Sequence, residues 1–254
     1  MTLRLEYLPT TDSPLSRLDP RWKLAGLLLS IFVIAVLTTI QASLLALGGA
    51  VLLAALSRLP LGWYLARLAA LAGVLSVFVV LLPFMLHRGD PEWTLGPVTF
   101  SWYGLRVALL LCLKALAIVT LTLVLLATAP LNANLKAAYA LRVPRLFVQV
   151  ALLTYRYVFV MFAELSRLRV ALRVRGYRNR ATRHSYRTVG HVSGALLVRG
   201  LERAERVSHA MRCRGFDGQF RSLDAFKTTS SDVVFFLVLI LGFGALCLWD
   251  FYKG

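Results

Sequence analysis

Hydrophobic residues in this chain gather into long runs that short polar segments separate. Residues 24–57 contain no charged residue. A single straight helix of that length would be about 51 Å long, which is more than a bilayer needs. Two short helices that turn at Gln41-Ala42-Ser43 fit better, because polar residues interrupt the run there. Further runs with little or no charge cover residues 68–86, 105–129 and 233–249, and each is long enough to cross about 30 Å of hydrocarbon.

These runs predict an all-α, polytopic membrane protein with about five transmembrane helices. The composition agrees, since 58% of the residues are hydrophobic and only 16% are charged, with a mean hydropathy of +0.70. Soluble domains carry about 25% charged residues. The first 23 residues mix charges with three prolines, so we expect no cleavable signal peptide there and assign insertion to the first span.

Positive charge is concentrated in one segment. Residues 131–228 hold 19 Lys or Arg and 5 Asp or Glu, whereas the rest of the chain holds 10 basic and 7 acidic residues. Lys and Arg beside membrane spans favour the cytoplasmic side, because their translocation is disfavoured. We therefore expect a cytoplasmic lead at residues 1–23, four transmembrane helices within 24–129, an Arg-rich cytoplasmic helical domain at 130–228 and a last transmembrane helix within 229–254.

Two charged residues within apolar segments leave alternatives open. Arg156 interrupts residues 144–164, and a charge near the middle of a span costs about 2.5–3.5 kcal/mol. We expect this segment to lie at the membrane interface or against other helices, with a sixth span as the alternative. Lys114 lies within residues 105–129. A cation in a span indicates a functional site by default, whereas a long stem that reaches an interface or a neighbouring helix gives a structural explanation.

One short sequence occurs twice. Residues 171–177 read Ala-Leu-Arg-Val-Arg-Gly-Tyr, and residues 210–216 read Ala-Met-Arg-Cys-Arg-Gly-Phe. Four of the seven positions are identical, and the other three are similar in kind. Both copies follow residues with helical spacing, and Gly176 and Gly215 fall where a residue with positive φ ends a helix. The motif therefore predicts two helix ends.

Each predicted helix end presents arginine beside a small residue. Arg175 and Arg214 fall in the last turn, where the helix dipole favours cations by about 0.3–1 kcal/mol. Ala171 and Ala210 precede them by four residues on the same face and leave room for close approach. This shape fits docking into a groove that offers acidic or carbonyl acceptors.

Two other functions remain open on these residues. A membrane-embedded enzyme is one, although such enzymes usually gather polar residues within spans and Lys114 is the main one here. A tether for anionic lipids or nucleic acid is the other, since the cationic segment would attract both. A tether would tolerate Lys in place of Arg, whereas docking requires the planar guanidinium. The Ala, Gly and aromatic neighbours of the arginines favour docking.

Three further stretches are distinctive. They are Leu18-Asp19-Pro20-Arg21-Trp22-Lys23-Leu24, Leu153-Thr154-Tyr155-Arg156-Tyr157, and Gly194-Ala195-Leu196-Leu197-Val198-Arg199 leading to Ala210-Met211-Arg212-Cys213-Arg214-Gly215-Phe216-Asp217-Gly218. With these residues the chain resembles, over nearly its whole length, the transmembrane coupling subunits of energy-coupling factor transporters. That is the EcfT family, and the resemblance is to its CbiQ type, which serves cobalt uptake.

In the EcfT family, two cytoplasmic coupling helices each end in Ala-Arg-Gly and dock into a groove on an ABC ATPase subunit. The matching triplets here are Val174-Arg175-Gly176 and Cys213-Arg214-Gly215, so the alanine is replaced in both. Residues that the resemblance implies in ATPase coupling are Ala171, Arg173, Arg175, Gly176, Ala210, Arg212, Arg214 and Gly215.

The resemblance also implies partners, cargo and location. The partners are ABC ATPase subunits, a metal-binding membrane subunit that captures the substrate, and membrane lipids, with no nucleic acid. Cobalt is the implied cargo, and nickel or a vitamin carried by the same machinery is the alternative. The implied location is the bacterial plasma membrane, with residues 130–228 as the cytoplasmic coupling domain.

The sequence lacks motifs for other chemistry. No Gly-x-x-x-x-Gly-Lys-[Ser/Thr] loop occurs, so we expect a transport component without catalytic residues, and ATP hydrolysis in separate subunits. No Cys/His cluster predicts a metal site, and no cofactor is expected. His184 and His191 have no third ligand nearby, so we expect them to be solvated. Cys112, Cys213 and Cys247 are too far apart to predict a disulfide.

Overall fold

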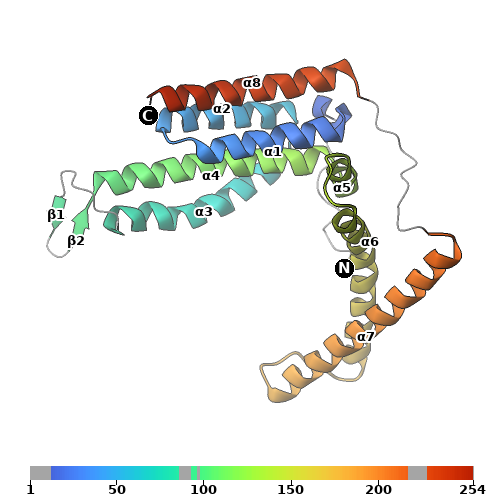
Figure 1. The fold of residues 1–254 in the computed structure, drawn as a ribbon. Helices are drawn as coiled ribbons and strands as arrows, with labels where there is room; N and C mark the ends of the chain where they lie inside the picture. Colours follow the sequence, from blue (N-terminus) through green and yellow to red (C-terminus); the bar gives the residue numbers. More distant parts are fainter. Residues whose placement is uncertain (1–12, 86–92, 96–97, 217–227, 254) are drawn as a thin grey trace. The chain divides into compact units, whose positions relative to one another are not determined.

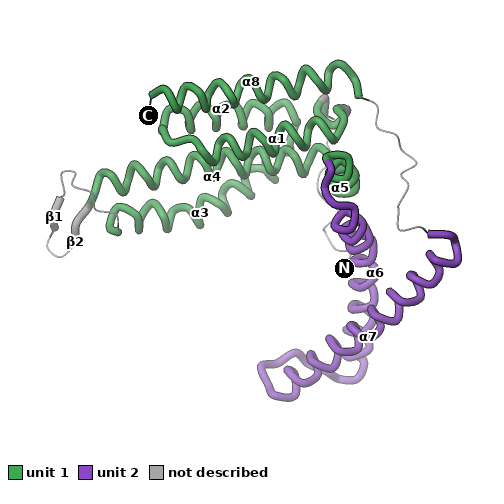
Figure 2. Tube along the Cα trace, in the orientation of Figure 1, with its two compact units in different colours: residues 1–141, 226–254 green, residues 142–225 purple. Residues whose placement is uncertain are grey.

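The computed structural model describes residues 13–85, 93–95, 98–216 and 228–253. Two compact units form, one from residues 1–141 and 226–254 and the other from residues 142–225 (Figure 2). Residues 1–12 of the predicted lead and Asp217-Gly218 of the family stretch lie outside the described residues.

The first unit contains most of the apolar helices (Figure 1). Its helices are α1 (Pro20–Val36), α2 (Ile40–Leu56), α3 (Leu61–Met85), α4 (Trp102–Thr128), α5 (Leu131–Ala140) and α8 (Ser230–Lys253), preceded by the 3₁₀ helix Pro14–Arg17. Between α3 and α4, the strands β1 (Trp93–Leu95) and β2 (Val98–Phe100) pair antiparallel.

The all-α polytopic class is confirmed. Within the described residues, four helices are long and apolar enough to cross a membrane: α3, α4, α6 (Arg145–Val174) and α8. Helices α1 and α2 have 17 residues each, which corresponds to about 26 Å. Helix α3 exposes most of its apolar surface, with Val74, Val77 and Val80 each at least 60% exposed, as lipid contact requires. The exact number of spans stays a prediction, and so does the placement of α6 in or on the membrane.

The predicted turn between the first two helices was wrong by a few residues. Helix α1 ends at Val36 and α2 begins at Ile40, so Gln41-Ala42-Ser43 lies in the first turn of α2. Thr39 is the N-cap, and its hydroxyl accepts a hydrogen bond from the Ala42 backbone N–H. A threonine at the N-cap satisfies a helical N–H that has no other partner, so polar residues here begin a helix rather than interrupt it.

Small residues allow the helices of the first unit to pack closely. Ala42, Ala46 and Ala50 follow one another at four-residue spacing on α2 and are fully buried, and α2 packs against α4. Gly104 on α4 meets α3 so closely that an added Cβ would lie 2.6 Å from the Leu82 carbonyl oxygen. Small side chains let backbones approach where lipid offers no hydrophobic driving force.

Helix α8 holds both ends of α1 through buried aspartates. Near the start of α1, the Asp19 backbone N–H donates to Asp232 Oδ1 at 2.8 Å, and Asp232 is 2% exposed. At the other end, Asp250 accepts hydrogen bonds from the backbone N–H groups of Thr38 (2.6 Å) and Thr39 (2.9 Å), and from both threonine hydroxyls. The two ends of α8 therefore hold the segments that flank α1 on either side.

Two lysines in the first unit bind backbone carbonyls. Lys23 is fully buried, and its Nζ donates to the carbonyls of Leu15 (3.2 Å) and Thr128 (3.0 Å). Lys114 Nζ donates to the Ala35 carbonyl at 3.1 Å, in the last turn of α1. Cations at a helix C-terminus are favourable because the last carbonyls have no partner within the helix. Lys114 thus has a structural partner on a neighbouring helix.

The second unit is a pair of long helices. Helix α6 has 30 residues and α7 (Arg183–Cys213) has 31, and each ends in one copy of the motif. The two helices contact each other, and residues 175–182 join them. The compact unit begins at Arg142, whereas α5 packs on α1 in the first unit. The start of the cytoplasmic coupling domain at residue 130 stays a prediction.

Candidate functional site

The two copies of the motif end α6 and α7 in the same way. In the first, Tyr177 N–H donates to the Leu172 carbonyl (3.0 Å) and Gly176 N–H to the Arg173 carbonyl (3.1 Å). This pair of hydrogen bonds defines the Schellman helix end, in which the glycine adopts positive φ. Gly176 has φ +77°. The predicted helix end is confirmed.

The second copy repeats these bonds position by position. Phe216 N–H donates to the Met211 carbonyl and Gly215 N–H to the Arg212 carbonyl, both at 3.0 Å. Gly215 has φ +74°. Arg214 is the C-cap residue of α7, as Arg175 is of α6. The two arginines therefore occupy equivalent positions on equivalent backbones.

Helix-end geometry explains part of the repeated sequence. In each copy the aliphatic and the aromatic residue are half-buried, Leu172 with Tyr177 and Met211 with Phe216, while the other positions are exposed. A hydrophobic contact between these two positions commonly accompanies the Schellman end. Gly, aliphatic and aromatic residues are thus accounted for by the helix end itself. The helix end does not account for the exposed alanines and arginines.

The exposed arginines of the motif have no partner within the described part of the chain. Arg173, Arg175, Arg212 and Arg214 are all exposed, and the ion pairs found among the described residues do not include them. An unpaired guanidinium on a fixed helix end offers its planar fork of donors to a partner. Ala171 and Ala210 are exposed as well and leave space beside each fork.

The two arginine ends lie at opposite ends of α7. Arg175 lines a cavity together with Thr182 and Ser185, at the beginning of α7, whereas Arg214 follows its last residue. With 31 residues, α7 spans about 46 Å. The sequence predicted two equivalent ends, and the structure adds the distance along α7 that separates them.

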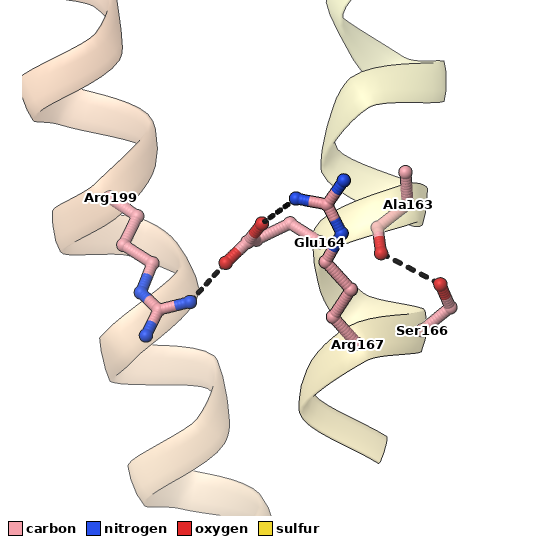
Figure 3. Close-up of polar contacts among 5 residues, drawn as sticks. All are labelled: Ala163, Glu164, Ser166, Arg167 and Arg199. Atoms are coloured by element: carbon pink, nitrogen blue, oxygen red, sulfur yellow. Dashed lines mark hydrogen bonds and ion pairs between the residues drawn. The ribbon is translucent and has the colours of Figure 1, made fainter. Parts of the chain in front are cut away.

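An ion-pair network joins the middles of α6 and α7 (Figure 3). Glu164 on α6 pairs with Arg199 on α7 and with Arg167 on its own helix, the latter at 3.6 Å. The Glu164 side chain is 16% exposed. Gly200 lies against the Met161 sulfur, which an added Cβ would meet at 3.8 Å. The sequence does not predict this crossing, because Glu164 and Arg199 are 35 residues apart and no local pattern links them.

An apolar groove continues from this crossing along the two helices. It has a volume of about 410 Å³ and is lined by Leu153, Tyr157 and Met161 of α6 and by Val207 and Met211 of α7. Residues 153–157, one of the stretches that carry the family resemblance, thus lie on the α6 side of this groove and face α7.

The histidines and cysteines of the described residues do not form a cluster. No group of three or more His, Cys, Asp or Glu residues among the described residues could hold a metal ion. His184 and His191 are exposed. His184 lines the cavity beside Arg175, a placement that the sequence alone did not suggest. Cys112, Cys213 and Cys247 are free thiols.

Fold and helix ends together define a class: a multi-pass helical membrane protein with a pair of cationic helix ends in a separate unit. The family described as cobalt transport protein, CbiQ, matches residues 11–223. The chain belongs to this family. It is the transmembrane component of an energy-coupling factor type transporter, a transport component and not an enzyme.

The chain is also similar to individual proteins. The chain is 30% identical to the cobalt transport protein CbiQ of Rhodobacter capsulatus over 73% of this chain and 72% of the relative. It is 26% identical to the energy-coupling factor transporter transmembrane protein EcfT of Streptococcus equi over 95% and 94%. An uncharacterized protein of Methanocaldococcus jannaschii is 25% identical over 79% and 70%.

Proposed function

We propose that this chain couples ATP hydrolysis in separate ABC ATPase subunits to a membrane subunit that captures a transition-metal ion for uptake. The observation that carries the proposal is the duplicated helix end, in which Arg175 and Arg214 occupy equivalent, exposed C-cap positions. The ATPase is a separate protein because the sequence contains no phosphate-binding loop.

The spacing of the two ends supports a partner with two similar binding sites. One helix, α7, separates them by about 46 Å. A partner built from two related subunits would present two grooves, and each groove would accept one helix end. A rigid helix between the ends would then transmit movement of one partner subunit toward the other. This is the physical basis on which we assign the motif residues to ATPase coupling.

The cargo and the orientation are proposed on other grounds. Cobalt is favoured because the matching family and the Rhodobacter capsulatus relative are both described as cobalt transport proteins. Nickel or a vitamin handled by the same machinery is the alternative, since the EcfT relative is described without a cargo. The excess of Lys and Arg in residues 131–228 supports a cytoplasmic location for the second unit, in a bacterial plasma membrane.

Reversing the charge of both ends tests the coupling role. The variant Arg175→Glu with Arg214→Glu should fold normally, because both side chains are exposed, and should lose the ATPase subunits on co-purification together with metal uptake. Arg169→Glu with Arg206→Glu is the matched control, since both residues are exposed arginines on the same two helices. Normal uptake and retained ATPase subunits in the first variant would overturn the proposal.

Replacement by lysine separates docking from simple charge attraction. Arg175→Lys with Arg214→Lys keeps the charge and removes the planar fork. Docking predicts reduced ATPase retention and at least about tenfold slower uptake, as expected when charge-assisted hydrogen bonds are lost. Unchanged uptake in this variant would favour a lipid or nucleic-acid tether instead.

A further inference from the structure

A cavity beside the first helix end shares Arg175 and Gly176 with the motif and extends beyond it to residues that the coupling role does not use. It has a volume of about 520 Å³ and lies between the end of α6 and the beginning of α7. Three arginines and one histidine line it, namely Arg175, Arg178, Arg180 and His184, together with the hydroxyl-bearing residues Thr182 and Thr188. None of the lining residues is acidic. The cavity therefore concentrates positive charge and hydrogen-bond donors around one space.

No acidic residue lies close in the sequence to the arginines of the cavity. Residues 165–201 contain nine arginines and neither Asp nor Glu, and Glu164, which precedes them, pairs with Arg167 and Arg199 instead. Like charges placed together repel one another, and an anion that binds between them removes that repulsion. This run of arginines was a signal in the sequence that could have indicated the site, although it did not show that a cavity lies at its centre.

Hydrogen bonds to Ser185 hold the loop 175–182, which forms part of the cavity. Ser185 is 4% exposed and is contacted by residues near both ends of this loop. The Tyr177 hydroxyl donates to Ser185 Oγ at 3.1 Å, and the Arg180 backbone N–H donates to the same atom at 3.2 Å. Arg178 and Arg180 thus extend from a backbone that is fixed before any ligand arrives, which lowers the entropic cost of binding.

The chemistry of the lining indicates the kind of ligand. Arg178 and Arg180, the two lining arginines outside the motif, together require an anion with several acceptor oxygens. A terminal phosphate carries about 1.5–2 negative charges and three oxygens that accept hydrogen bonds, and the phosphodiester of a lipid headgroup offers the same kind of oxygens with less charge. Arginine binds both with two parallel hydrogen bonds. A phosphate matches this donor set in both charge and geometry.

Exposed apolar residues on the two helices that form the cavity suggest where the phosphate comes from. Val174 is 83% exposed, Tyr186 73% and Val189 52%, and each is next in sequence to a residue that lines the cavity. Exposed apolar and aromatic side chains on helices that also carry a cationic site are suited to the boundary between lipid headgroups and acyl chains. Anionic headgroups also attract basic segments on the cytoplasmic side of a membrane.

We propose that the cavity between α6 and α7 binds a phosphate group, held by Arg178 and Arg180, with an anionic phospholipid headgroup as its source. This goes beyond the coupling role and does not depend on it. Arg175 serves the helix end, so the site is tested through Arg178 and Arg180 alone.

Phosphate binding can be measured on the purified full-length chain in nanodiscs of phosphatidylcholine. Inorganic phosphate is titrated at constant ionic strength, with chloride and acetate as competing anions. We expect Arg178→Ala with Arg180→Ala to weaken phosphate binding about tenfold or more. The control Arg169→Ala with Arg206→Ala removes the same charge away from the cavity and should change binding less than about twofold.

The source of the phosphate is tested with lipids. Native mass spectrometry of the chain from mixed phosphatidylglycerol and phosphatidylcholine micelles should show retained phosphatidylglycerol, and the Arg178→Ala, Arg180→Ala variant should lose it. Binding of inorganic phosphate without retained phosphatidylglycerol would keep the phosphate chemistry and replace the lipid by a free phosphate compound.

Three results would overturn the proposal. One is equal weakening in the cavity variant and its control, which would show unspecific attraction. Another is a wild-type chain that binds neither inorganic phosphate nor phosphatidylglycerol. The third is loss of ATPase co-purification from the cavity variant with unchanged phosphate binding, which would assign the cavity to protein docking. Arg178→Lys with Arg180→Lys keeps the loop charge and should give intermediate phosphate affinity, which guards against a folding artefact.

Discussion

Charged residues serve opposite purposes in the two units of this protein. In the first unit Lys23, Asp232 and Asp250 are almost fully buried, and each binds backbone groups of other segments. In the second unit the motif arginines, among them Arg175 and Arg214, are exposed and have no partner among the described residues. The buried charges hold segments of the fold together, whereas the exposed charges on a fixed backbone are available to bind another molecule.

The difference follows from what surrounds each charge. A buried charge without hydrogen-bond partners is strongly unfavourable, so those in the first unit persist only because carbonyls and N–H groups surround them. An exposed arginine is solvated and contributes little to folding. Substitutions should therefore destabilise the first unit and leave the stability of the second nearly unchanged, while the second loses function.

The largest effect on stability is expected at Asp250. Asp250→Ala leaves the N–H groups of Thr38 and Thr39 without their acceptor, and we expect the free energy of unfolding to fall by about 3 kcal/mol. Thermal unfolding of the purified chain in detergent measures the change. Lys253→Ala is the matched control, because Lys253 joins α8 to Gln41 of α2 through an exposed hydrogen bond. Equal losses in the two variants would contradict the contrast between buried and exposed charges.

A somewhat smaller effect is expected where two helices of the first unit touch. Gly104→Ala would place a Cβ 2.6 Å from the Leu82 carbonyl oxygen and 2.7 Å from the Pro83 Cα, so the helices must separate at a cost of about 2 kcal/mol. Gly73→Ala is the control, because nothing lies within 4 Å of that position. The same unfolding assay should show Gly73→Ala unchanged or slightly stabilised, since alanine favours helix. A tolerated Gly104→Ala would disprove the close approach.

In the second unit, substitution at a helix end should have a local effect. Gly215→Ala forces a side chain into positive φ (+74°), which costs about 1 kcal/mol. Hydrogen exchange of the Phe216 amide, which donates to the Met211 carbonyl, should become faster. Gly194→Ala, in the open interior of α7, should leave that amide protected. Unchanged protection in Gly215→Ala would mean that the helix end does not need glycine.

The smallest effect is expected at the ion pair in Figure 3. Glu164→Gln removes the charge that faces Arg199 and Arg167, and because Arg199 is 50% exposed the loss should be about 0.5 kcal/mol. A double-mutant cycle with Arg199→Gln measures the coupling energy, which should shrink in high salt. A coupling energy comparable to the Asp250→Ala loss would show that the second unit also depends on charge for its stability.

Most helices and both motif-bearing helix ends could be predicted from residues that lie close together in the sequence. Apolar runs predicted the helices of the first unit, since each must satisfy its own backbone in lipid. Gly176 and Gly215 predicted the helix ends, because a Schellman end depends on six consecutive residues. The turn between α1 and α2 was misplaced because Gln41 and Ser43 lie in the first turn of α2 behind its N-cap Thr39. The sequence near Thr39 also does not indicate the contact with Asp250, 211 residues away.

The sequence by itself determined that this is a polytopic helical protein with two equivalent arginine-bearing helix ends, because helix formation and helix termination are local. Only the tertiary structure decided how the charges are used. It paired Asp250 with the start of α2, buried Lys23 among carbonyls, and gathered Arg178, Arg180 and His184 around one cavity. Those outcomes depend on which segments meet in space, and the spacing of residues along one chain does not contain that information.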